Sequence, residues 1–294
     1  MAASMESQCD DVNKLQALIS LIDEPDTASF AKVREQIFNI GIPAVPFLEN
    51  AWENTFDSGI QQRIEDIIHN IQFNQLHFDL VKWAGSKNID LLEGYILFTK
   101  YLYPSLNVAR IRDQILRLRK DIWIELNENL TPLEKIKVVN HIFYDHYKFS
   151  LPDKQEADPK YLFINNLLDS STGYSISIGI LYTILAQSLG IPLFGILLPG
   201  ERYFMAWIEP DLSLNVKVKF CINPENRGGV FTKEELVLLM RKLRLPAQED
   251  YFIPLKPIAT IDKMFEILSY LFIASGDNSR IDEISRLREA FSEF

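Results

Sequence analysis

The stretch that decides the fold runs from Ser175 to Asn223 and reads SISIGILYTILAQSLGIPLFGILLPGERYFMAWIEPDLSLNVKVKFCIN. Its first part, up to Leu189, carries no charged residue and has the length of a buried helix. Three runs of strand length follow, each bounded by Gly, Pro or Asp: Leu193 to Leu198, Tyr203 to Glu209 and Val216 to Ile222. This order predicts a central helix packed on a small antiparallel sheet.

A membrane-spanning helix is the alternative for this region, because no charged residue occurs from Ser171 to Gly200 and a span needs only about 20 apolar residues. However, Gly190 and Pro192 should end a helix that begins near Ser175. Gln187 and Ser188 would also need hydrogen-bond partners in lipid. A buried helix followed by a buried strand therefore fits better, and we expect no membrane partner.

The composition is that of a folded, acidic chain. Of its 294 residues, 47% are hydrophobic and 24% are charged, with a formal net charge of −10. A nucleic-acid partner or an anionic membrane surface would require a clustered positive face, so neither is expected. Two cysteines, Cys9 and Cys221, form no disulfide framework, and no signal peptide is recognisable, which favours the cytoplasm.

Helices are expected on both sides of this centre. Residues from about Asn13 to Leu80 show short stretches of helical periodicity, which resemble HEAT-type helical pairs although one or two units do not make an array. Two more helices are expected from Ile89 to Tyr103 and from Val108 to Leu126. Capped helix starts are expected at Thr131 and Thr232, each followed three positions later by Glu.

Two features of the helical part could bind ligands but have simpler interpretations. The helix from Val108 carries a basic side that we expect to be solvated, because Asp113, Asp121 and Glu125 offset its Arg and Lys residues. His141 and His146 lie five positions apart, which is poor spacing for two metal ligands on one helix face. We expect no metal and no other cofactor.

The central residues resemble the transglutaminase-like branch of the papain-type cysteine enzymes, and specifically the bacterial SirB-type proteins. In that family a G-x-C motif opens the central helix, and L-G-I-P leads to the first strand. An H-A-W-V-E motif lies on the next strand, and Asp-Pro closes the third. The corresponding segments here are Gly173-Tyr174-Ser175, Leu189-Gly190-Ile191-Pro192, Met205-Ala206-Trp207-Ile208-Glu209 and Asn223-Pro224. The resemblance implies an α+β papain/transglutaminase-like core.

The resemblance also implies where a catalytic cysteine, histidine and aspartate would lie. Carried over residue by residue, these positions hold Ser175, Met205 and Asn223. A second alignment, through Leu198-Pro199-Gly200, places Glu201 at the histidine position instead. A serine without a base is a poor nucleophile, and a thioether cannot accept a proton at neutral pH. Working catalytic residues are therefore not expected.

Five residues are candidates for lining a remaining groove: Ser175, Tyr203, Trp207, Cys221 and Asn223. Cys221 could be a relocated nucleophile, because it points to the same side of its strand as Asn223. A buried thiol packed in the core is the alternative that we favour for Cys221. Tyr203 and Trp207 are expected to be core or groove-lining aromatic residues.

These patterns predict three domains. Residues 1–82 form the HEAT-like helical segment, and residues 83–245 form the transglutaminase-like domain with its leading helices. Residues 246–294 form a short tail with helices from about Thr260 to Ala274 and from Arg280. This tail resembles the tetratricopeptide-like end of SirB-type proteins, reduced here to about one helical pair.

Three functions follow, in order of preference. The first is a non-catalytic interaction or regulatory module that binds a peptide or protein segment. The second is a hydrolase or acyl transferase with Ser175 or Cys221 as nucleophile and Glu201 or a histidine from the helix at His141 as base. The third is a helical scaffold whose central domain has no groove function.

Overall fold

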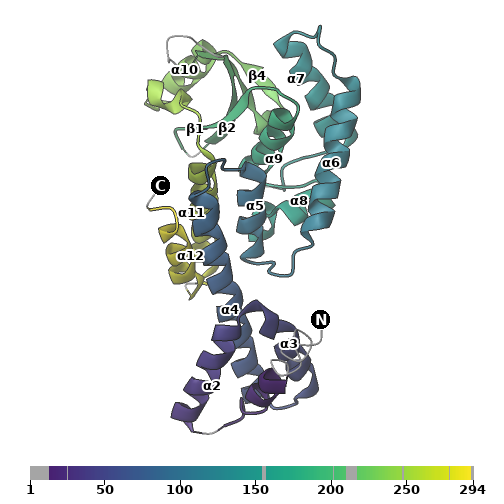
Figure 1. The fold of residues 1–294 in the computed structure, drawn as a ribbon. Coiled ribbons are helices and arrows are strands. Elements are labelled where there is room, and N and C mark those ends of the chain that lie inside the picture. The colour runs from purple at the N-terminus through teal and green to yellow at the C-terminus, as the bar shows by residue number, and fades with distance from the viewer. Residues whose placement is uncertain are drawn as a thin grey trace. The chain divides into compact units, whose positions relative to one another are not determined.

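The computed structural model describes residues 13–24, 26–153, 157–200, 202–209, 217–246, 248–277 and 279–292. The chain divides into two compact units, Met1–Asp79 and Leu80–Phe294 (Figure 1). Helices build the first unit, whereas helices and one sheet build the second. The α+β class is therefore confirmed.

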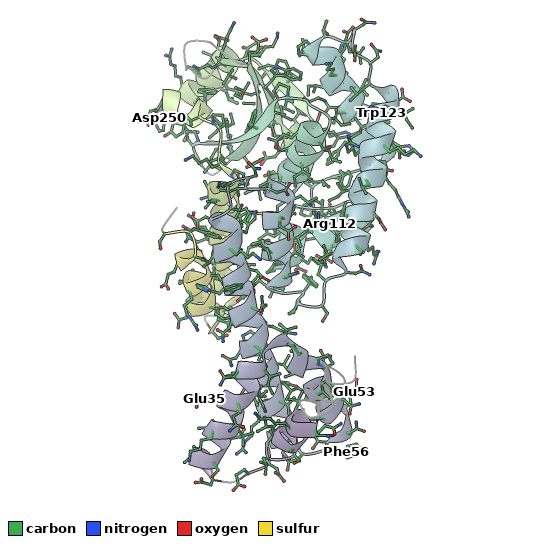
Figure 2. The ribbon with its side chains drawn as sticks, in the orientation of Figure 1. Glu35, Glu53, Phe56, Arg112, Trp123 and Asp250 are labelled. Atoms are coloured by element: carbon green, nitrogen blue, oxygen red, sulfur yellow. The ribbon has the colours of Figure 1, made fainter. Side chains whose placement is uncertain are left out.

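The first unit is an assembly of helices around an aliphatic core. After helical residues 13–19, its elements are α2 (Thr27–Ile40), the 3-10 turn η1 (Ile42–Ala44), α3 (Val45–Asn54) and the part of α4 (Ser58–Ala84) up to Asp79. The Asp26 side chain caps α2 by accepting a hydrogen bond of 2.9 Å from the Ser29 amide. Ile37 and Leu48 are fully buried in the core, whereas Phe56 in the α3–α4 connection is 98% exposed (Figure 2). The HEAT-like character of this unit stays a prediction.

The second unit surrounds one long buried helix, α9 (Ser175–Ser188). The helices before it are α5 (Leu91–Lys100), α6 (Val108–Glu125), α7 (Pro132–Asn140), the π-helix η2 (His141–His146), the 3-10 turn η3 (Pro159–Leu162) and α8 (Ile164–Ser170). After the sheet come α10 (Lys233–Lys242), the 3-10 turn η5 (Glu249–Phe252), α11 (Pro257–Ser275) and α12 (Ser279–Glu289). All α9 side chains from Ile176 to Ala186 are buried, as expected for a helix without an amphipathic pattern.

The sheet is antiparallel, with strand order β1-β2-β3-β4. Its strands are β1 (Leu193–Leu198), β2 (Arg202–Glu209), β3 (Lys217–Asn223) and β4 (Gly229–Phe231), with the 3-10 turn η4 (Pro224–Asn226) between the last two. The first three strands agree with the sequence prediction, apart from residues 210–216, which lie outside the described ranges. The fourth strand was not predicted, because it has only three residues, the first of them a glycine, and these carry too little alternating pattern.

The two faces of the sheet are covered by different helices. Alternate side chains of β2, including Tyr203 and Met205, point toward α9, because successive strand residues face opposite sides. The intervening side chains, such as Phe204 and Ala206, join a second core with Leu236 of α10. A side chain's place in the sheet thus decides which of the two cores it enters.

Local capping signals are confirmed at both predicted helix starts. Thr131 and Glu134 form a reciprocal capping box on α7, and Thr232 and Glu235 form another on α10. Helix α11 begins at Pro257, three residues before the predicted start at Thr260. The difference reflects the preference of proline for the first turn of a helix.

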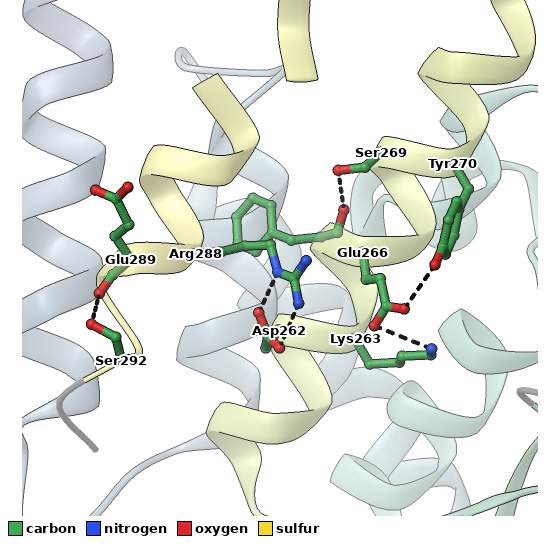
Figure 3. A network of polar contacts seen from close by, with 9 residues as sticks. Asp262, Lys263, Glu266, Ser269, Tyr270, Arg288, Glu289 and Ser292 are labelled. Carbon is green, nitrogen blue, oxygen red and sulfur yellow. Dashed lines mark hydrogen bonds and ion pairs between the residues drawn. The ribbon is translucent and has the colours of Figure 1, made fainter. Parts of the chain in front are cut away.

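Helix α11 packs on both α5 and α12, below the sheet in the view of Figure 1. Arg288 of α12 holds Asp262 of α11 through two hydrogen bonds of 2.6 and 3.0 Å (Figure 3). The hydroxyl of Tyr101, the residue directly after α5, donates a hydrogen bond of 2.9 Å to Glu283 of α12.

Among the helices of the described residues, none is long and apolar enough to cross a membrane.

Candidate functional site

Ser175 occupies the first turn of α9, where the family places its nucleophile. The Tyr174 amide ahead of it donates a hydrogen bond of 3.1 Å to the Tyr161 carbonyl, and the buried Gly173 packs closely against Leu167. The helix start is therefore held firmly, and Ser175 is half-buried. Its hydroxyl makes no hydrogen bond to any residue in the described ranges.

The two positions that should handle the proton are occupied by other chemistry. Met205 on β2 is fully buried, and in the sheet it lies between Gly195 and Ile222. Asn223 ends β3, and its side-chain oxygen accepts a hydrogen bond of 2.9 Å from the Glu225 amide. The Asn223 side chain therefore stabilises the turn η4 and does not orient an imidazole, as the family's aspartate would.

Tyr203 and Trp207 lie on the same side of β2 as Met205 but are not open to solvent. Tyr203 is 1% exposed, and its ring lies over Gly179 of α9, where an added Cβ would come within 2.5 Å of it. Trp207 is also buried and packs on Phe220 with ring centroids 5.4 Å apart. Both side chains are therefore largely covered by their neighbours, and Trp207 packs within the core.

Tyr203 contacts α9 at Gly179, in the turn that follows Ser175. Gly179 lies one turn after Ser175, on the same face of the helix and about 6 Å along its axis. Burial raises the pKa of Tyr203 above its usual value, so its hydroxyl stays protonated at neutral pH. A protonated phenol can donate a hydrogen bond but cannot serve as the missing base.

Cys221 lies on the opposite face of the sheet from Met205. Its partner in the neighbouring strand is Ala206, and it is fully buried in the core that α10 covers. Burial raises the pKa of the Cys221 thiol to about 12, while the Lys233 ammonium acts in the opposite direction. The structure therefore separates Cys221 from the groove candidates and favours the interpretation as a core residue.

We expect iodoacetamide to alkylate Cys221 at pH 8 about a thousandfold or more slowly in the folded protein than in urea, since only the thiolate reacts. Residue-resolved mass spectrometry checks this. The raised pKa of Cys221 also makes the stability of the fold depend on pH. Its contribution to the free energy of unfolding is fully present below pH about 8.5. It is lost as the pH rises toward the pKa in the folded state, because the thiol of the unfolded chain ionises first. Rapid alkylation of the folded chain at Cys221 would contradict its assignment to the core.

Of the remaining base candidates, the histidines of η2 form no hydrogen bond with Ser175. Glu201 lies outside the described residues. His141 Nδ1 lies 3.3 Å from Asp145, whose pKa is lowered first by this hydrogen bond and also by Arg227, while His146 stacks edge-on against Tyr147. Within the described residues, no group of three or more His, Cys, Asp or Glu side chains could hold a metal ion.

A polar network that sequence reasoning missed ties the strand end to the helices. Asn140 of α7 donates a hydrogen bond of 2.9 Å to the Gly228 carbonyl and accepts one of 2.9 Å from the Tyr182 hydroxyl of α9. Gly228 has a φ of +74° and lies so close to Asn140 that a Cβ would clash. The pair Gly228-Gly229 was the available sequence signal for this contact.

Comparison with known proteins defines the class to which this fold and site belong. A family model described as the Transglutaminase-like superfamily matches residues 109–266, which is more than half of the chain. The chain therefore belongs to the transglutaminase-like superfamily. The finer SirB-type resemblance stays a prediction.

Curated relatives of the chain carry the name UPF0162 protein. The one from Buchnera aphidicola subsp. Schizaphis graminum is 28% identical over 184 residues, which cover 61% of this chain and 65% of the relative. The one from Xylella fastidiosa is 26% identical over 155 residues, 52% of each chain, and the one from Vibrio cholerae is 26% identical over 113 residues, 38% of this chain and 42% of the relative. The chain thus spans less than two thirds of the length of these relatives. No solved structure matches it significantly.

Proposed function

We propose that this chain is a non-catalytic member of its superfamily that acts by binding a peptide or protein segment. The observation that carries the proposal is the side chain at the base position: Met205 is a fully buried thioether where the family has an imidazole. Ser175 has no hydrogen-bonded base in the described ranges, and a serine hydroxyl needs one to react at neutral pH. Asn223 is engaged by its own turn.

Covalent labelling tests the absence of chemistry. A fluorophosphonate probe should leave Ser175 unmodified at pH 7–9, because nothing removes its proton. Ser175→Cys provides the matched control: iodoacetamide should label this half-buried thiol at the helix start and so prove that a reagent reaches the position. A probe adduct at Ser175 that forms faster in folded than in unfolded protein would instead establish the alternative hydrolase or acyl transferase.

A binding surface is available on the outer side of α6. Leu116, Trp123 and Ile124 are 56%, 63% and 59% exposed, respectively, and Leu116 lies about two helical turns before the other two on this side. Figure 2 shows Trp123 on α6. Arg117 and Lys120 lie between them and form no ion pair with the described residues, although Asp113 one turn earlier offsets part of their charge. We call Leu116, Arg117, Lys120, Trp123 and Ile124 the α6 stripe.

The α6 stripe fits an acidic peptide with apolar side chains. Exposed large apolar residues grouped on one helix face mark interaction surfaces more often than isolated ones do. In a symmetric contact with a second copy, the cations of the two stripes would face each other, and two chains of net charge −10 would also repel each other, so a second copy fits this surface less well than an acidic peptide. The apolar side chains would supply most of the affinity, and the cations would select for acidic partners.

Synthetic peptides test this surface. We expect a fluorescein-labelled amphipathic peptide of Glu and Leu to bind, with affinity that falls as salt rises, and the same peptide with Lys in place of Glu to bind at least tenfold more weakly. Trp123→Ala should lower the affinity about tenfold or more, whereas Leu238→Ala, at an exposed position on α10, should not change it. Equal binding of both peptides, or no effect of Trp123→Ala in fluorescence polarisation, would refute the α6 stripe as the site.

A further inference from the structure

Two adjoining chambers lie beside the C-terminal half of α9, away from the family's catalytic positions. The outer chamber, of about 540 Å³, lies between α6, α9 and the start of α5. The inner chamber, of about 200 Å³, lies under β1 and the start of α11. Both are lined by Asp90, Leu91 and Gln187, so they are adjacent, and we call the two chambers together the cleft; the outer chamber alone is within the usual size range of small-molecule sites.

The inner chamber contains two buried hydroxyls without hydrogen-bond partners. Thr183 and Tyr203 line it, each is 1% exposed, and neither hydroxyl is paired. Both residues line this same small chamber, Thr183 from α9 and Tyr203 from β2. Buried polar groups are nearly always paired in proteins, so two unpaired hydroxyls in one chamber indicate that it receives a hydrogen-bonding group.

The outer chamber has a cation at its rim. Arg119 donates a hydrogen bond of 3.2 Å from Nε to the Ser188 carbonyl and has no carboxylate partner among the described residues. A second guanidinium, Arg112, is already paired with Glu93. The start of α5 adds a favourable helix dipole for an anion, while the Asp90 carboxylate is used to cap the Glu93 amide at 2.8 Å. Leu91, Ile115 and Ile184 supply an apolar wall, and Leu116 is the residue of the α6 stripe that also lines this chamber.

The spacing of these groups sets the length of a ligand. Arg119 is bound at Ser188, and the two hydroxyls lie at the level of Thr183, five residues earlier on α9. Five residues of α-helix rise about 7.5 Å. An extended aliphatic chain with bonds of about 1.5 Å advances about 1.25 Å per bond because of its tetrahedral angles, so this distance corresponds to about six bonds.

We propose that this cleft binds a small organic anion with a short aliphatic body and a hydrogen-bonding group at the far end. Its carboxylate lies at Arg119, its methylene groups pass Leu91 and Ile184, and its terminal oxygen exchanges hydrogen bonds with Tyr203 and Thr183. The site does not depend on Ser175 or on the outward-facing Arg117, Lys120, Trp123 and Ile124. It gives the chain a small-molecule ligand in addition to any peptide partner.

Four small molecules separate the contributions of the carboxylate, the aliphatic chain and the terminal hydroxyl to the binding affinity. In isothermal titration calorimetry we expect 6-hydroxyhexanoate to bind at least tenfold more tightly than hexanoate, which lacks the hydroxyl, and than 1,6-hexanediol, which lacks the charge. Acetate, which has only the charge, should bind weakest. Equal affinities of 6-hydroxyhexanoate and 1,6-hexanediol would show that Arg119 does not bind the carboxylate.

Variants locate the binding groups. Arg119→Gln should abolish the preference for the anion, whereas Lys120→Gln, the neighbouring residue, should leave it unchanged. Tyr203→Phe and Thr183→Val should remove the preference for the hydroxyl and raise the melting temperature of the ligand-free protein, because each removes an unpaired buried oxygen. If the wild type binds none of the probes at millimolar concentration, or if Tyr203→Phe keeps the preference for 6-hydroxyhexanoate over hexanoate, the proposal is overturned and the hydroxyls serve a buried water only.

Discussion

Phe98→Ala is expected to lower the free energy of unfolding of the Leu80–Phe294 unit by about 3–5 kcal/mol, the usual cost of deleting a fully buried aromatic side chain. Phe98 on α5 has no exposed surface. Its ring stacks on Phe163 with centroids 5.1 Å apart and meets Phe265 of α11 edge-on at 4.9 Å. The side chain therefore joins three segments that are distant in the sequence. Urea denaturation followed by circular dichroism measures the change.

Phe56→Ala is the matched control, because it makes the same change at a phenylalanine that is 98% exposed. Its effect should stay within about 0.5 kcal/mol, as for most surface substitutions. If Phe98→Ala lowers the free energy of unfolding by less than about 1.5 kcal/mol, the rings of Phe163 and Phe265 must move to fill the cavity that the substitution creates. That result would contradict the rigid packing of these three rings.

Gly179→Ala is expected to destabilise the protein by about 1–3 kcal/mol, the range for overpacked cores. Helix propensity alone predicts the opposite sign, since replacing a mid-helix glycine by alanine usually stabilises by about 1 kcal/mol. The difference arises because the added methyl would come within 2.5 Å of the Tyr203 ring, which Gly195 also confines from the side of β1. The sign of the change in thermal or urea unfolding thus decides between the two effects.

A second substitution isolates the clash. In the background Tyr203→Leu, which vacates part of the ring's space, Gly179→Ala should cost at least about 1 kcal/mol less than in the wild type, a coupling typical of residues in contact. If the cost is the same in both backgrounds, the ring of Tyr203 is not the obstacle. A stabilising Gly179→Ala in the wild type would contradict the close packing of α9 on β2.

The central helix and the first three strands could be predicted because their apolar runs end at residues that terminate helices and strands. Gly190 and Pro192 separate α9 from β1, and Thr131 and Thr232 mark two helix starts that the structure confirms. Strand β4 could not be predicted, since it is held by its pairing with β3 and not by its own pattern. Local sequence signals thus predicted α9 and the first three strands, whereas β4 depends on tertiary pairing that the sequence does not show.

The candidate site was harder to predict because it depends on register. Met205 pairs with Ile222, so Cys221 and Met205 fall on opposite faces of the sheet, which the sequence of either strand cannot reveal. Alternation places Asn223 with Cys221, yet the amide of Asn223 turns into η4 because the strand ends there. Thr183 and Gln187 were visible as polar residues in an uncharged helix, but only the packing of Tyr203 over Gly195 shows what lies beside them.

The strand order β1-β2-β3-β4 has a consequence for how the chain folds. Every strand pairs with its immediate successor, so the sheet can assemble through short loops whose closure costs little entropy. The bond between Tyr101 and Glu283, in contrast, joins residues 182 positions apart. Contacts of such long range form slowly, because the intervening chain must first be brought together. During synthesis the hairpins can therefore form well before α11 and α12 emerge to complete the other end of the unit.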